Sequence, residues 1–269
     1  MLAAPNRKIS LIKMNGAGNS FAIFDERETA VSLTSQQIQK IAQEFFCDQI
    51  IVLHPSNDCD ALMEIFNRDG SISGACGNAT RCVASLFKQN EVKIKTAAGV
   101  LRCWRAGENK ISVAVAIPKF LPAEIPLKNS SAEKIELFGF EFSCVNVGNP
   151  HAVSFINSVI SDEKFFDVGP KVETHEIFPQ KTNVEFARIL SDDLIEVRVF
   201  ERGAGETLAC GTGACAVGIL AMKKKLITKN SVTTRFKGGD LQISWDGDDS
   251  AVIMTGGYEL EFVREIEIS

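Results

Sequence analysis

The positions of apolar residues along the chain predict a protein built mainly of β-strands. Short runs rich in Val, Ile, Leu and Phe recur throughout the sequence and are separated by Gly, Asn, Asp and Pro. Such runs, bounded by turn-forming residues, are typical of antiparallel sheet. We predict strands over 9–14, 21–24, 50–54, 62–66, 92–96, 100–104, 111–116, 145–147, 152–155, 184–189, 194–200, 231–235, 241–245, 251–255 and 258–266.

Helical periodicity is rarer and marks four segments. We predict helices over 34–46, 77–89, 162–168 and 211–225, the first of them capped by Ser32 or Thr34. Residues 83–87 and 214–222 are apolar on nearly every face, and a helix of that kind must be buried. The pattern therefore predicts an α+β fold in which a mainly antiparallel sheet wraps around a central apolar helix, once in each half of the chain.

A repeat half the chain long connects the two halves. Residues 66–68, Phe-Asn-Arg, lead through a glycine-containing loop to Ala-Cys-Gly at 75–77, and Phe-Glu-Arg at 200–202 leads through another to Ala-Cys-Gly at 209–211. The same offset of 134 residues relates Gln49 to Asn183, and the Gly-Asn pair at 18–19 precedes the one at 148–149 by 130. We interpret the halves as two copies of one fold.

The repeat also predicts two pseudo-symmetric domains. Prolines at 118, 122 and 126 mark a change of composition near the midpoint. We place one domain over 1–117 and the other over 118–257, with the final strand at 258–269 as a candidate to pack back on the first. Equivalent positions in such a pair put Cys76 and Cys210 opposite each other across the cleft between the domains. That cleft is the expected active site.

Composition and charge narrow the class of protein. A chain of 269 residues with 45% hydrophobic and 23% charged residues suits a two-domain globular protein. The net charge is −5 and there is no basic stripe, which argues against nucleic-acid binding. Residues 1–8 lack the apolar core of a signal peptide, and no stretch approaches the roughly 20 apolar residues of a membrane span. We therefore expect a soluble, cytoplasmic protein with no membrane or nucleic-acid partner.

Eight cysteines are many for such a chain. None forms a Cys-x-x-Cys pair, and a core of this size needs no disulfides, so reduced thiols are expected. The three histidines, His54, His151 and His175, lie far apart in the sequence, so we predict no metal site. No neighbouring motif singles out His54 or His175, and we assign both to structure.

Cys76 and Cys210 both stand where a loop becomes a predicted buried helix. The unpaired N–H groups of a helix's first turn carry partial positive charge, so they lower the pKa of a thiol and hold a carboxylate. The ordinary alternative is that both are core cysteines, the usual role of an unmodified Cys. Because the repeat places both at helix starts, we favour function: two opposed thiols suggest proton transfer on both faces of one carbon. Cys82 and Cys215, further into the same helices, are assigned to packing.

Other candidate residues also have ordinary alternatives. Residues 16–19, Gly-Ala-Gly-Asn, follow a predicted strand, but no Lys-Ser/Thr comes after them as in a phosphate-binding loop. A tight turn that presents Asn19 is the better interpretation. His151 is either a functional histidine or a turn histidine satisfied within its loop. Glu201 and Arg202 are either site residues or an exposed ion pair, and their match to the repeat at 67–68 favours the site.

Four sequence blocks carry a resemblance to a known enzyme family. They are 13–21, 66–82, 147–151 and 201–216, and the last, ERGAGETLACGTGACA, is highly specific. In these blocks, spread in order over essentially the whole length, the chain resembles diaminopimelate epimerase, which interconverts LL- and meso-diaminopimelate in lysine and cell-wall precursor biosynthesis. The resemblance implies a cofactor-independent isomerase that forms a homodimer. No lysine is singled out as a Schiff base for pyridoxal phosphate.

The resemblance assigns roles position by position. Cys76 and Cys210 resemble the acid/base pair, and His151 and Glu201 resemble the groups that tune them. The other matched positions resemble substrate-binding residues: Asn19, Gln49, Asn67, Gly77, Asn78, Asn149, Asn183, Glu201, Arg202, Gly211 and Thr212. The two residues that follow each cysteine are expected to hold the carboxylate at the reacting carbon. Arg202 and the asparagines are expected to bind the far end of the substrate.

Two positions depart from the family's usual pattern. Ser20 stands where the family usually has Asp, and Ala79 where it usually has Gly. Neither position is catalytic in the family, so the departures bear on loop geometry rather than on chemistry.

Three alternative functions stay open at this point. The first is another racemase or a phenazine-type isomerase on the same fold, which the retained asparagines and Arg202 argue against. The second is a binding protein that lost the chemistry, which would lack one of the two cysteines. The third is a redox switch that joins Cys76 to Cys210, which no Cys-x-x-Cys motif supports.

Overall fold

The computed structural model describes residues 7–28, 33–128 and 131–268. The chain divides into two compact units, Met1–Val113 with Gly256–Ser269, and Ala114–Thr255. Each unit has a hydrophobic core of its own. Strands β8 (Lys110–Ala114) and β17 (Ile253–Gly257) contain the two points at which the chain passes from one unit to the other.

The first unit contains nine strands and helices before β8 and one strand from the end of the chain. They are β1 (Arg7–Gly16), β2 (Asn19–Asp25), α1 (Ser35–Glu44), β3 (Gln49–His54), β4 (Ala61–Asn67), β5 (Ile72–Ser73), α2 (Gly77–Ser85), β6 (Glu91–Thr96), β7 (Gly99–Gly107) and, after the second unit, β18 (Glu259–Ile268).

The second unit has the same succession of elements after one extra short strand. They are β9 (Ile135–Leu137), β10 (Phe140–Asn146), β11 (Pro150–Phe155), α3 (Asp162–Glu173), β12 (Asn183–Ser191), β13 (Leu194–Glu201), β14 (Gly205–Glu206), α4 (Gly211–Lys223), β15 (Ser231–Phe236) and β16 (Gly239–Ser244).

Strand pairing repeats between the units. β1 pairs with β2 and β10 with β11, both antiparallel, and the next strands, β3 and β12, then add in parallel. Antiparallel partners follow (β3 with β4, β12 with β13), and β6 and β15 add in parallel to β4 and β13. β7 and β16 each close a hairpin with the strand before them. This repetition confirms the predicted α+β fold with two similar halves.

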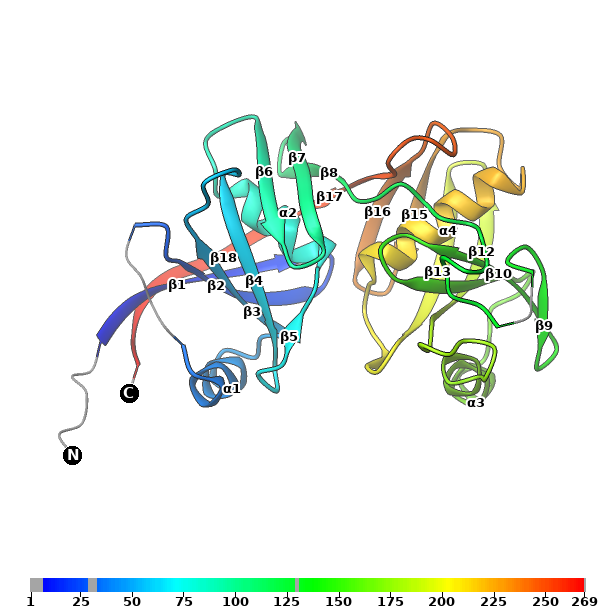
Figure 1. Cartoon of the computed structure of the whole chain (residues 1–269), viewed down its shortest axis with the longest axis horizontal. Coiled ribbons are helices and arrows are strands. Elements are labelled where there is room, and N and C mark those ends of the chain that lie inside the picture. The colour runs from blue at the N-terminus through cyan, green and yellow to red at the C-terminus, as the bar shows by residue number, and fades with distance from the viewer. Residues whose placement is uncertain (1–6, 29–32, 129–130, 269) are drawn as a thin grey trace. The chain divides into compact units, whose positions relative to one another are not determined.

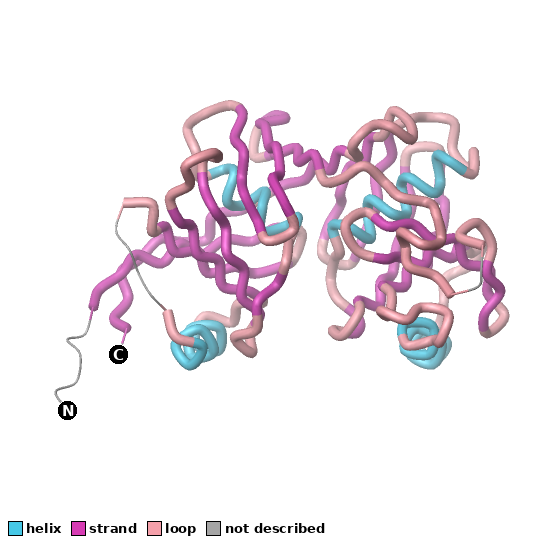
Figure 2. Tube along the Cα trace, in the orientation of Figure 1, coloured by secondary structure: helices cyan, strands magenta, loops and turns pink. Residues whose placement is uncertain are grey.

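A buried helix lies among the strands of each unit. α4 contacts β10, β11, β12, β13, β15 and β16, and α2 contacts β1, β2, β6 and β7. Figures 1 and 2 show these helices enclosed by strands, whereas α1 and α3 lie outside them. Ten residues of α4 are buried, as expected of a helix that is apolar on nearly every face.

Helix boundaries differ most from the predicted ones at the ends of α2 and α3. Thr34 caps α1 with a capping box, while Ser32 lies outside the described residues. α2 ends at Ser85 rather than at 89. α3 continues through Gly169-Pro170 to Glu173 instead of ending at 168. Packing explains this continuation: Val168 and Val172 are buried, and a Cβ at Gly169 would lie 3.0 Å from the Phe200 ring. Tertiary contacts here override the helix-ending tendency of a Gly-Pro pair.

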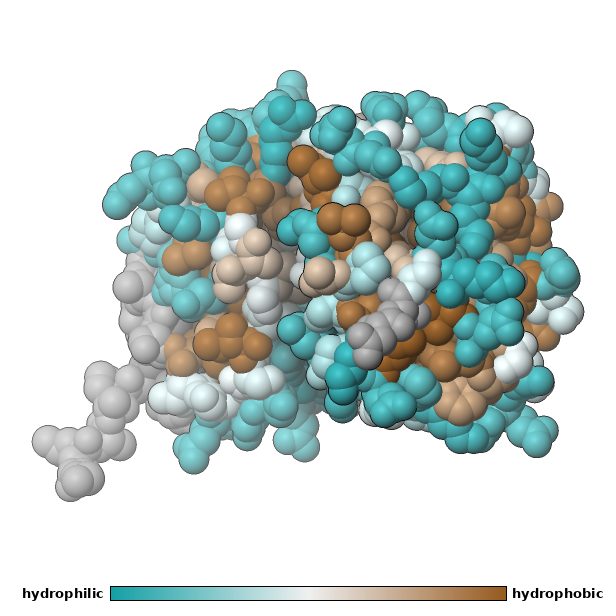
Figure 3. All heavy atoms as spheres, turned by 45° about the vertical axis from the view of Figure 1, so that its right-hand side comes forward, coloured by the Kyte–Doolittle hydropathy of each residue, from teal (hydrophilic) through white to brown (hydrophobic). Residues whose placement is uncertain are grey.

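Three two- or three-residue strands, β5, β9 and β14, escaped prediction because their runs are too short to show a period. The strand at the end of the chain, β18, pairs antiparallel with β1 along the first unit, from Asn15 with Glu259 to Arg7 with Ile268. Within the described part of the chain, no helix is both long enough and apolar enough to span a membrane. Figure 3 shows hydrophilic side chains over much of one face, with apolar residues scattered among them.

Candidate active site

Cys76 is the N-cap residue of α2. Its backbone is extended (φ −148°, ψ 108°), and its carbonyl oxygen accepts the first helical hydrogen bond from Thr80 N at 2.9 Å. The side chain is partly exposed. Gly77 and Asn78 follow as the first two helical residues, so their N–H groups belong to the unpaired first turn. This is the arrangement that the sequence predicted for an anion-binding helix start.

A hydrogen-bond chain fixes the polar residues beside this helix start. The Asn78 amide nitrogen donates to Asn19 Oδ1, and the Asn78 oxygen accepts from Arg81 Nη1 at 2.9 Å. Arg81 also contacts Gly77 O at 3.5 Å and is completely buried. Sequence reasoning missed Arg81, although a charged residue on the buried face of an apolar helix was a visible signal. Its guanidinium holds the Asn78 amide, which in turn holds Asn19.

The ends of two adjacent strands bring Gln49 and Asn67 together. They are direct partners in the antiparallel β3–β4 pair, and Gln49 Nε2 donates to Asn67 Oδ1 at 3.0 Å. The Asn67 amide nitrogen donates to Ser71 Oγ at 3.0 Å. The two predicted substrate-binding amides therefore form one cluster at the strand ends.

Both departures from the family pattern lie in the first unit. Ser20 Oγ accepts from the buried Lys13 ammonium, and its backbone N–H donates to Asp48 Oδ2 at 2.8 Å. The Lys13 ammonium forms an ion pair with Glu261 of β18, at 3.4 Å. An Asp at position 20 would supply that carboxylate directly. Ala79 is completely buried in the first turn of α2.

Cys210 caps α4 as Cys76 caps α2, but its thiol is buried. Only 5% of the residue is exposed. The thiol sulfur accepts a hydrogen bond from Gly213 N at 3.4 Å and lies 3.5 Å from Thr212 Oγ1. The predicted helix-start geometry, with Gly211 and Thr212 in the first turn, is thus present in the second unit as well.

The prediction of a low pKa for the Cys210 thiol is wrong. Burial raises the pKa of Cys210 well above 9.0, and the carboxylates of Glu201 and Glu185 raise it further. The hydrogen bonds from Thr212 and Gly213 lower it by less. The helix start was expected to decide the charge state, but removal of the sulfur from water outweighs it. Cys210 is therefore a protonated thiol at neutral pH.

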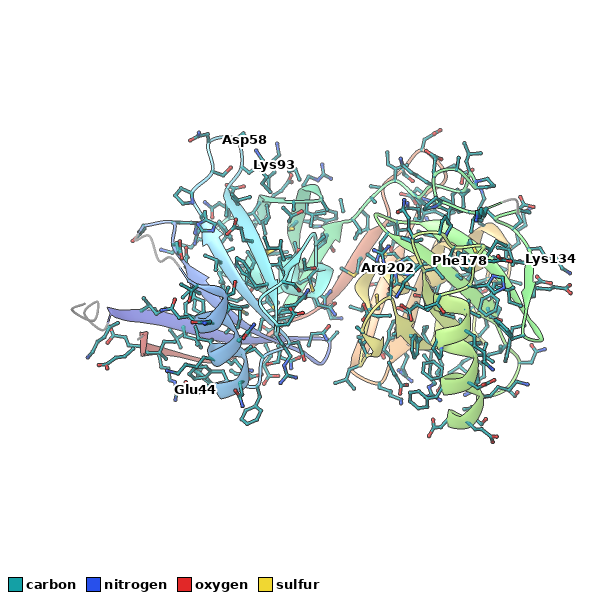
Figure 4. All side chains as sticks on the ribbon, turned by 60° about the horizontal axis from the view of Figure 1, so that its bottom comes forward. Glu44, Asp58, Lys93, Lys134, Phe178 and Arg202 are labelled. Atoms are coloured by element: carbon teal, nitrogen blue, oxygen red, sulfur yellow. The ribbon has the colours of Figure 1, made fainter. Side chains whose placement is uncertain are left out.

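Asn183 shapes the loop that carries Arg202. Its amide nitrogen donates to Pro150 O at 2.9 Å, and its oxygen accepts from Arg202 N at 3.0 Å. The Arg202 guanidinium is exposed at the end of β13 and contacts Gln180 O at 3.1 Å. Figure 4 shows Arg202 and Lys134 on opposite sides of this unit.

Two carboxylates support the same loop. Glu201 Oε1 accepts a short hydrogen bond from the Thr207 hydroxyl. Glu173, at the end of α3, accepts from Gly203 N at 2.9 Å through Oε1 and is buried. Gly203 has φ +78°, a conformation that favours glycine. Sequence reasoning missed Glu173, because it lies 30 residues before the loop that it holds.

His151 is a completely buried polar residue of the second unit. Its Nδ1 lies 2.7 Å from Glu185 Oε1, its Nε2 lies 2.9 Å from Asn149 Oδ1, and neither His151 nor Glu185 is exposed. Sequence reasoning missed Glu185, which stands in an apolar strand. The signal was its position 134 residues after Ile51, where the first half is apolar.

The remaining histidines and cysteines lie in ordinary surroundings. His54 contacts Glu26 and Glu64, and the His175 ring stacks edge-on against Phe138. All eight cysteines are within the described residues, and none is in a disulfide. Cys82 and Cys215 are completely buried, as expected of packing residues.

Comparison with known proteins identifies the family to which these features belong. The family described as Diaminopimelate epimerase matches residues 11–118 and 143–261. The chain belongs to the diaminopimelate epimerase family. It is therefore an isomerase of the epimerase type and serves amino-acid biosynthesis.

Relatives match the chain over nearly its full length. The Diaminopimelate epimerase of Pelagibacter ubique is 40% identical over 257 residues, which cover 90% of this chain and 93% of the relative. The Diaminopimelate epimerase of Methylocella silvestris is also 40% identical, over 95% of this chain and 94% of its own.

Solved structures with lower identity share the fold. A hydroxyproline epimerase from Agrobacterium vitis has a TM-score of 0.66 at 14% identity and covers 97% of this chain and 93% of its own. A PhzF-family phenazine biosynthesis protein from Bacillus anthracis has a TM-score of 0.66 at 17% identity, over 98% and 99% of the two chains. These likenesses show that the fold carries several activities, so substrate identity rests on the site.

Proposed function

We propose that this chain interconverts LL- and meso-diaminopimelate without a cofactor, with Cys76 and Cys210 as the acid/base pair. The observation that carries the proposal is that the two thiols occupy equivalent positions, each as the N-cap of a buried helix. Membership in the diaminopimelate epimerase family supports the reaction.

The proposed reaction is a proton exchange at the α-carbon. One cysteine, as thiolate, takes the α-proton and becomes a thiol, while the other thiol gives its proton to the opposite face and becomes a thiolate. No electron leaves or enters the substrate, so the step needs no oxidant or reductant. The negative charge that develops on the α-carboxylate is stabilised by fixed N–H groups, which Gly77-Asn78 and Gly211-Thr212 supply.

Differences in the surroundings of the two thiols suggest their starting roles. Cys210 is held in the thiol form by burial and by nearby carboxylates, so it begins as the acid. Cys76 then begins as the base. The mechanism requires both sulfurs to reach one carbon, and the roles exchange in the reverse direction.

Specificity is proposed to come from the far end of the substrate, which carries a second ammonium and carboxylate. Arg202 offers a planar fork that suits a carboxylate, and its backbone is fixed by Asn183. Asn67 and Asn149 supply amide groups at strand ends. A shorter amino acid would leave these polar groups without partners, which weakens its binding.

The test is incubation of the purified chain with LL-diaminopimelate in heavy water under reducing conditions. We expect meso product that carries deuterium at the inverted carbon, formed without added cofactor. Proline, hydroxyproline and phenazine precursors serve as competing substrates, because proteins of this fold bear those names. Turnover of one of them in place of diaminopimelate would reject the proposal.

We also propose that the protein acts as a cytoplasmic homodimer. The support is the family resemblance alone. Light scattering coupled to size exclusion measures the mass directly. A mass of one chain, 29.3 kDa, at micromolar concentration would contradict the dimer.

A further inference from the structure

The two halves differ at one pair of buried positions. In the parallel pair β11–β12, His151 is the partner of Asn183, and Glu185 follows two residues later on the same face of β12. In the equivalent pair β2–β3, Phe21 is the partner of Gln49, and Ile51 follows two residues later. Where the first unit has buried Phe21 and Ile51, the second therefore has buried His151 and Glu185.

The fold forms without a His–Glu pair at these positions. Phe21 and Ile51 are both 0% exposed and fill the equivalent place with apolar groups. Burying a carboxylate costs free energy, and an apolar pair of similar volume is often equally stable. Among the described residues, no hydrogen-bond donor reaches Glu185 Oε2, so the carboxylate is not fully compensated either. A gain in folding stability therefore does not explain the His151–Glu185 pair.

The geometry of the pair fixes the histidine ring. Nδ1 lies 2.7 Å from Glu185 Oε1 and Nε2 lies 2.9 Å from Asn149 Oδ1, so both ring nitrogens face oxygen acceptors. Burial raises the pKa of Glu185, and His151 opposes that rise. The pair can be ionised, with a charged imidazolium and a carboxylate, or neutral, with an imidazole and a carboxylic acid. In both cases one hydrogen lies between Nδ1 and Oε1, and another on Nε2 points to Asn149.

Glu185 also lies beside the helix start that carries the second thiol. A Cβ at Gly213 would lie 2.8 Å from Glu185 Oε1 and 3.4 Å from Cys210 Sγ. The equivalent residue of the first half, 134 positions earlier, is Ala79. Glycine at 213 thus leaves room for the carboxylate. The charged or titratable groups around Glu185 are Cys144 of β10, His151 of β11, Glu201 of β13 and Cys210 of α4.

We propose that Glu185 is a positioning residue of the active site: it holds His151 so that Nε2 fixes the substrate-binding amide of Asn149. The proposal rests on the proposed function for its chemical meaning, because His151 and Asn149 are assigned there to acid/base tuning and substrate binding. The contact between Glu185 and His151 stands independently of the substrate.

The first test compares Glu185→Gln with Glu196→Gln. Both changes neutralise a Glu on the β12–β13 strand pair, but Glu196 pairs with Arg188 on a partly exposed face. We expect Glu185→Gln to lower kcat/KM for LL-diaminopimelate about 10- to 100-fold and to change the shape of its pH profile. Glu196→Gln should have the same kcat/KM and the same pH profile as the parent. A Glu185→Gln enzyme with the parent's rate and profile would overturn the proposal.

The second test reads the histidine ring without any substrate. The chain has three histidines, so ¹⁵N imidazole spectra contain three ring systems, and His54→Gln and His175→Gln variants assign them. We expect the His151 Nδ1 signal of the parent to show its hydrogen bond to Glu185 and to shift in Glu185→Gln, with the other two rings unchanged. Unchanged His151 signals would show that Glu185 does not hold the ring. This spectrum also decides the contact if the parent fails to epimerise diaminopimelate, a result that would count against the proposed function alone.

The third test copies the first half into the second with His151→Phe/Glu185→Ile. If the pair serves the site rather than the fold, the melting temperature stays within about 5 °C of the parent while epimerisation is lost. A fall of more than about 10 °C would assign the pair to stability and overturn the proposal.

Discussion

The two helix starts have similar extended N-cap backbones and different surroundings. Cys76 is partly exposed, and the buried guanidinium of Arg81 contacts the carbonyl of the following residue, Gly77. Cys210 is buried, and its neighbours are the carboxylates of Glu185 and Glu201. Duplication of the fold supplies two equivalent thiols, while residues that differ between the halves give them different surroundings.

This difference suits a reaction that needs an acid and a base of one chemical type. Two thiols in identical surroundings would have equal affinity for a proton. Burial and the nearby carboxylates favour the thiol form of Cys210, which leaves the thiolate role to Cys76. The difference between the two helix starts predicts that substitutions at equivalent positions of the two halves have unequal effects. The expected effects range from loss of epimerisation to a small change in the free energy of unfolding.

The largest expected effect comes from removing either sulfur. Cys76→Ala and Cys210→Ala should each lower the rate of epimerisation by at least about a thousandfold, because inversion requires proton transfer on both faces of the α-carbon. Product formation is followed by chiral chromatography. Cys82→Ala and Cys215→Ala, the matched changes inside the two helices, should keep most of the activity.

Exchange of the substrate's α-hydrogen with solvent on one face only would support the assignment. Near-normal epimerisation by either Cys76→Ala or Cys210→Ala would show that the two-thiol mechanism is wrong for this chain.

The reactivity of the two thiols toward iodoacetamide should differ by at least about tenfold at pH 7. Burial and nearby carboxylates raise the pKa of Cys210, which disfavours its thiolate, and its sulfur is buried. Peptide mass spectrometry should find Cys76 modified first. Because burial and nearby carboxylates raise the pKa of Cys210, its alkylation should accelerate only at strongly alkaline pH.

The urea-unfolded chain, in which all eight cysteines react, provides the control for labelling efficiency. Equal rates at Cys76 and Cys210 in the folded protein would remove the proposed asymmetry.

A moderate effect is expected at Arg202 and none at its equivalent, Arg68. Arg202→Lys keeps the charge but loses the planar fork, so kcat/KM for diaminopimelate should fall about tenfold, with little change in melting temperature. Arg68→Lys, at the exposed equivalent position, is the matched control and should leave kcat/KM unchanged. The same loss in both variants would mean that Arg202 has no special role in recognition.

The smallest effect is expected at Ala79, whose equivalent is Gly213. Ala79→Gly introduces the residue usual in the family and should lower the free energy of unfolding by about 0.5–1 kcal/mol, because glycine disfavours the helix. Urea unfolding measures this change, and activity should persist. A large loss of activity would show that Ala79 has a role in the site beyond packing.

The sequence by itself determined most of the architecture and the identity of the two thiols. Strand and helix periods are local properties of the chain, and the repeat marks equivalent positions without coordinates. Cys76 and Cys210 could therefore be placed at helix starts, and the family blocks supplied the candidate substrate-binding residues. Even the capping residue Thr34 followed from the local pattern.

Only the tertiary structure decided the electrostatic surroundings of those residues. The His151–Glu185 pair joins residues 34 positions apart, and Glu173 accepts a hydrogen bond from Gly203, 30 positions later. The pKa of Cys210 was predicted in the wrong direction because a helix start is visible in the sequence, whereas burial and the approach of two carboxylates are not. Local periodicity fixes which face of an element is apolar, but the charge that a thiol meets depends on side chains brought from other strands.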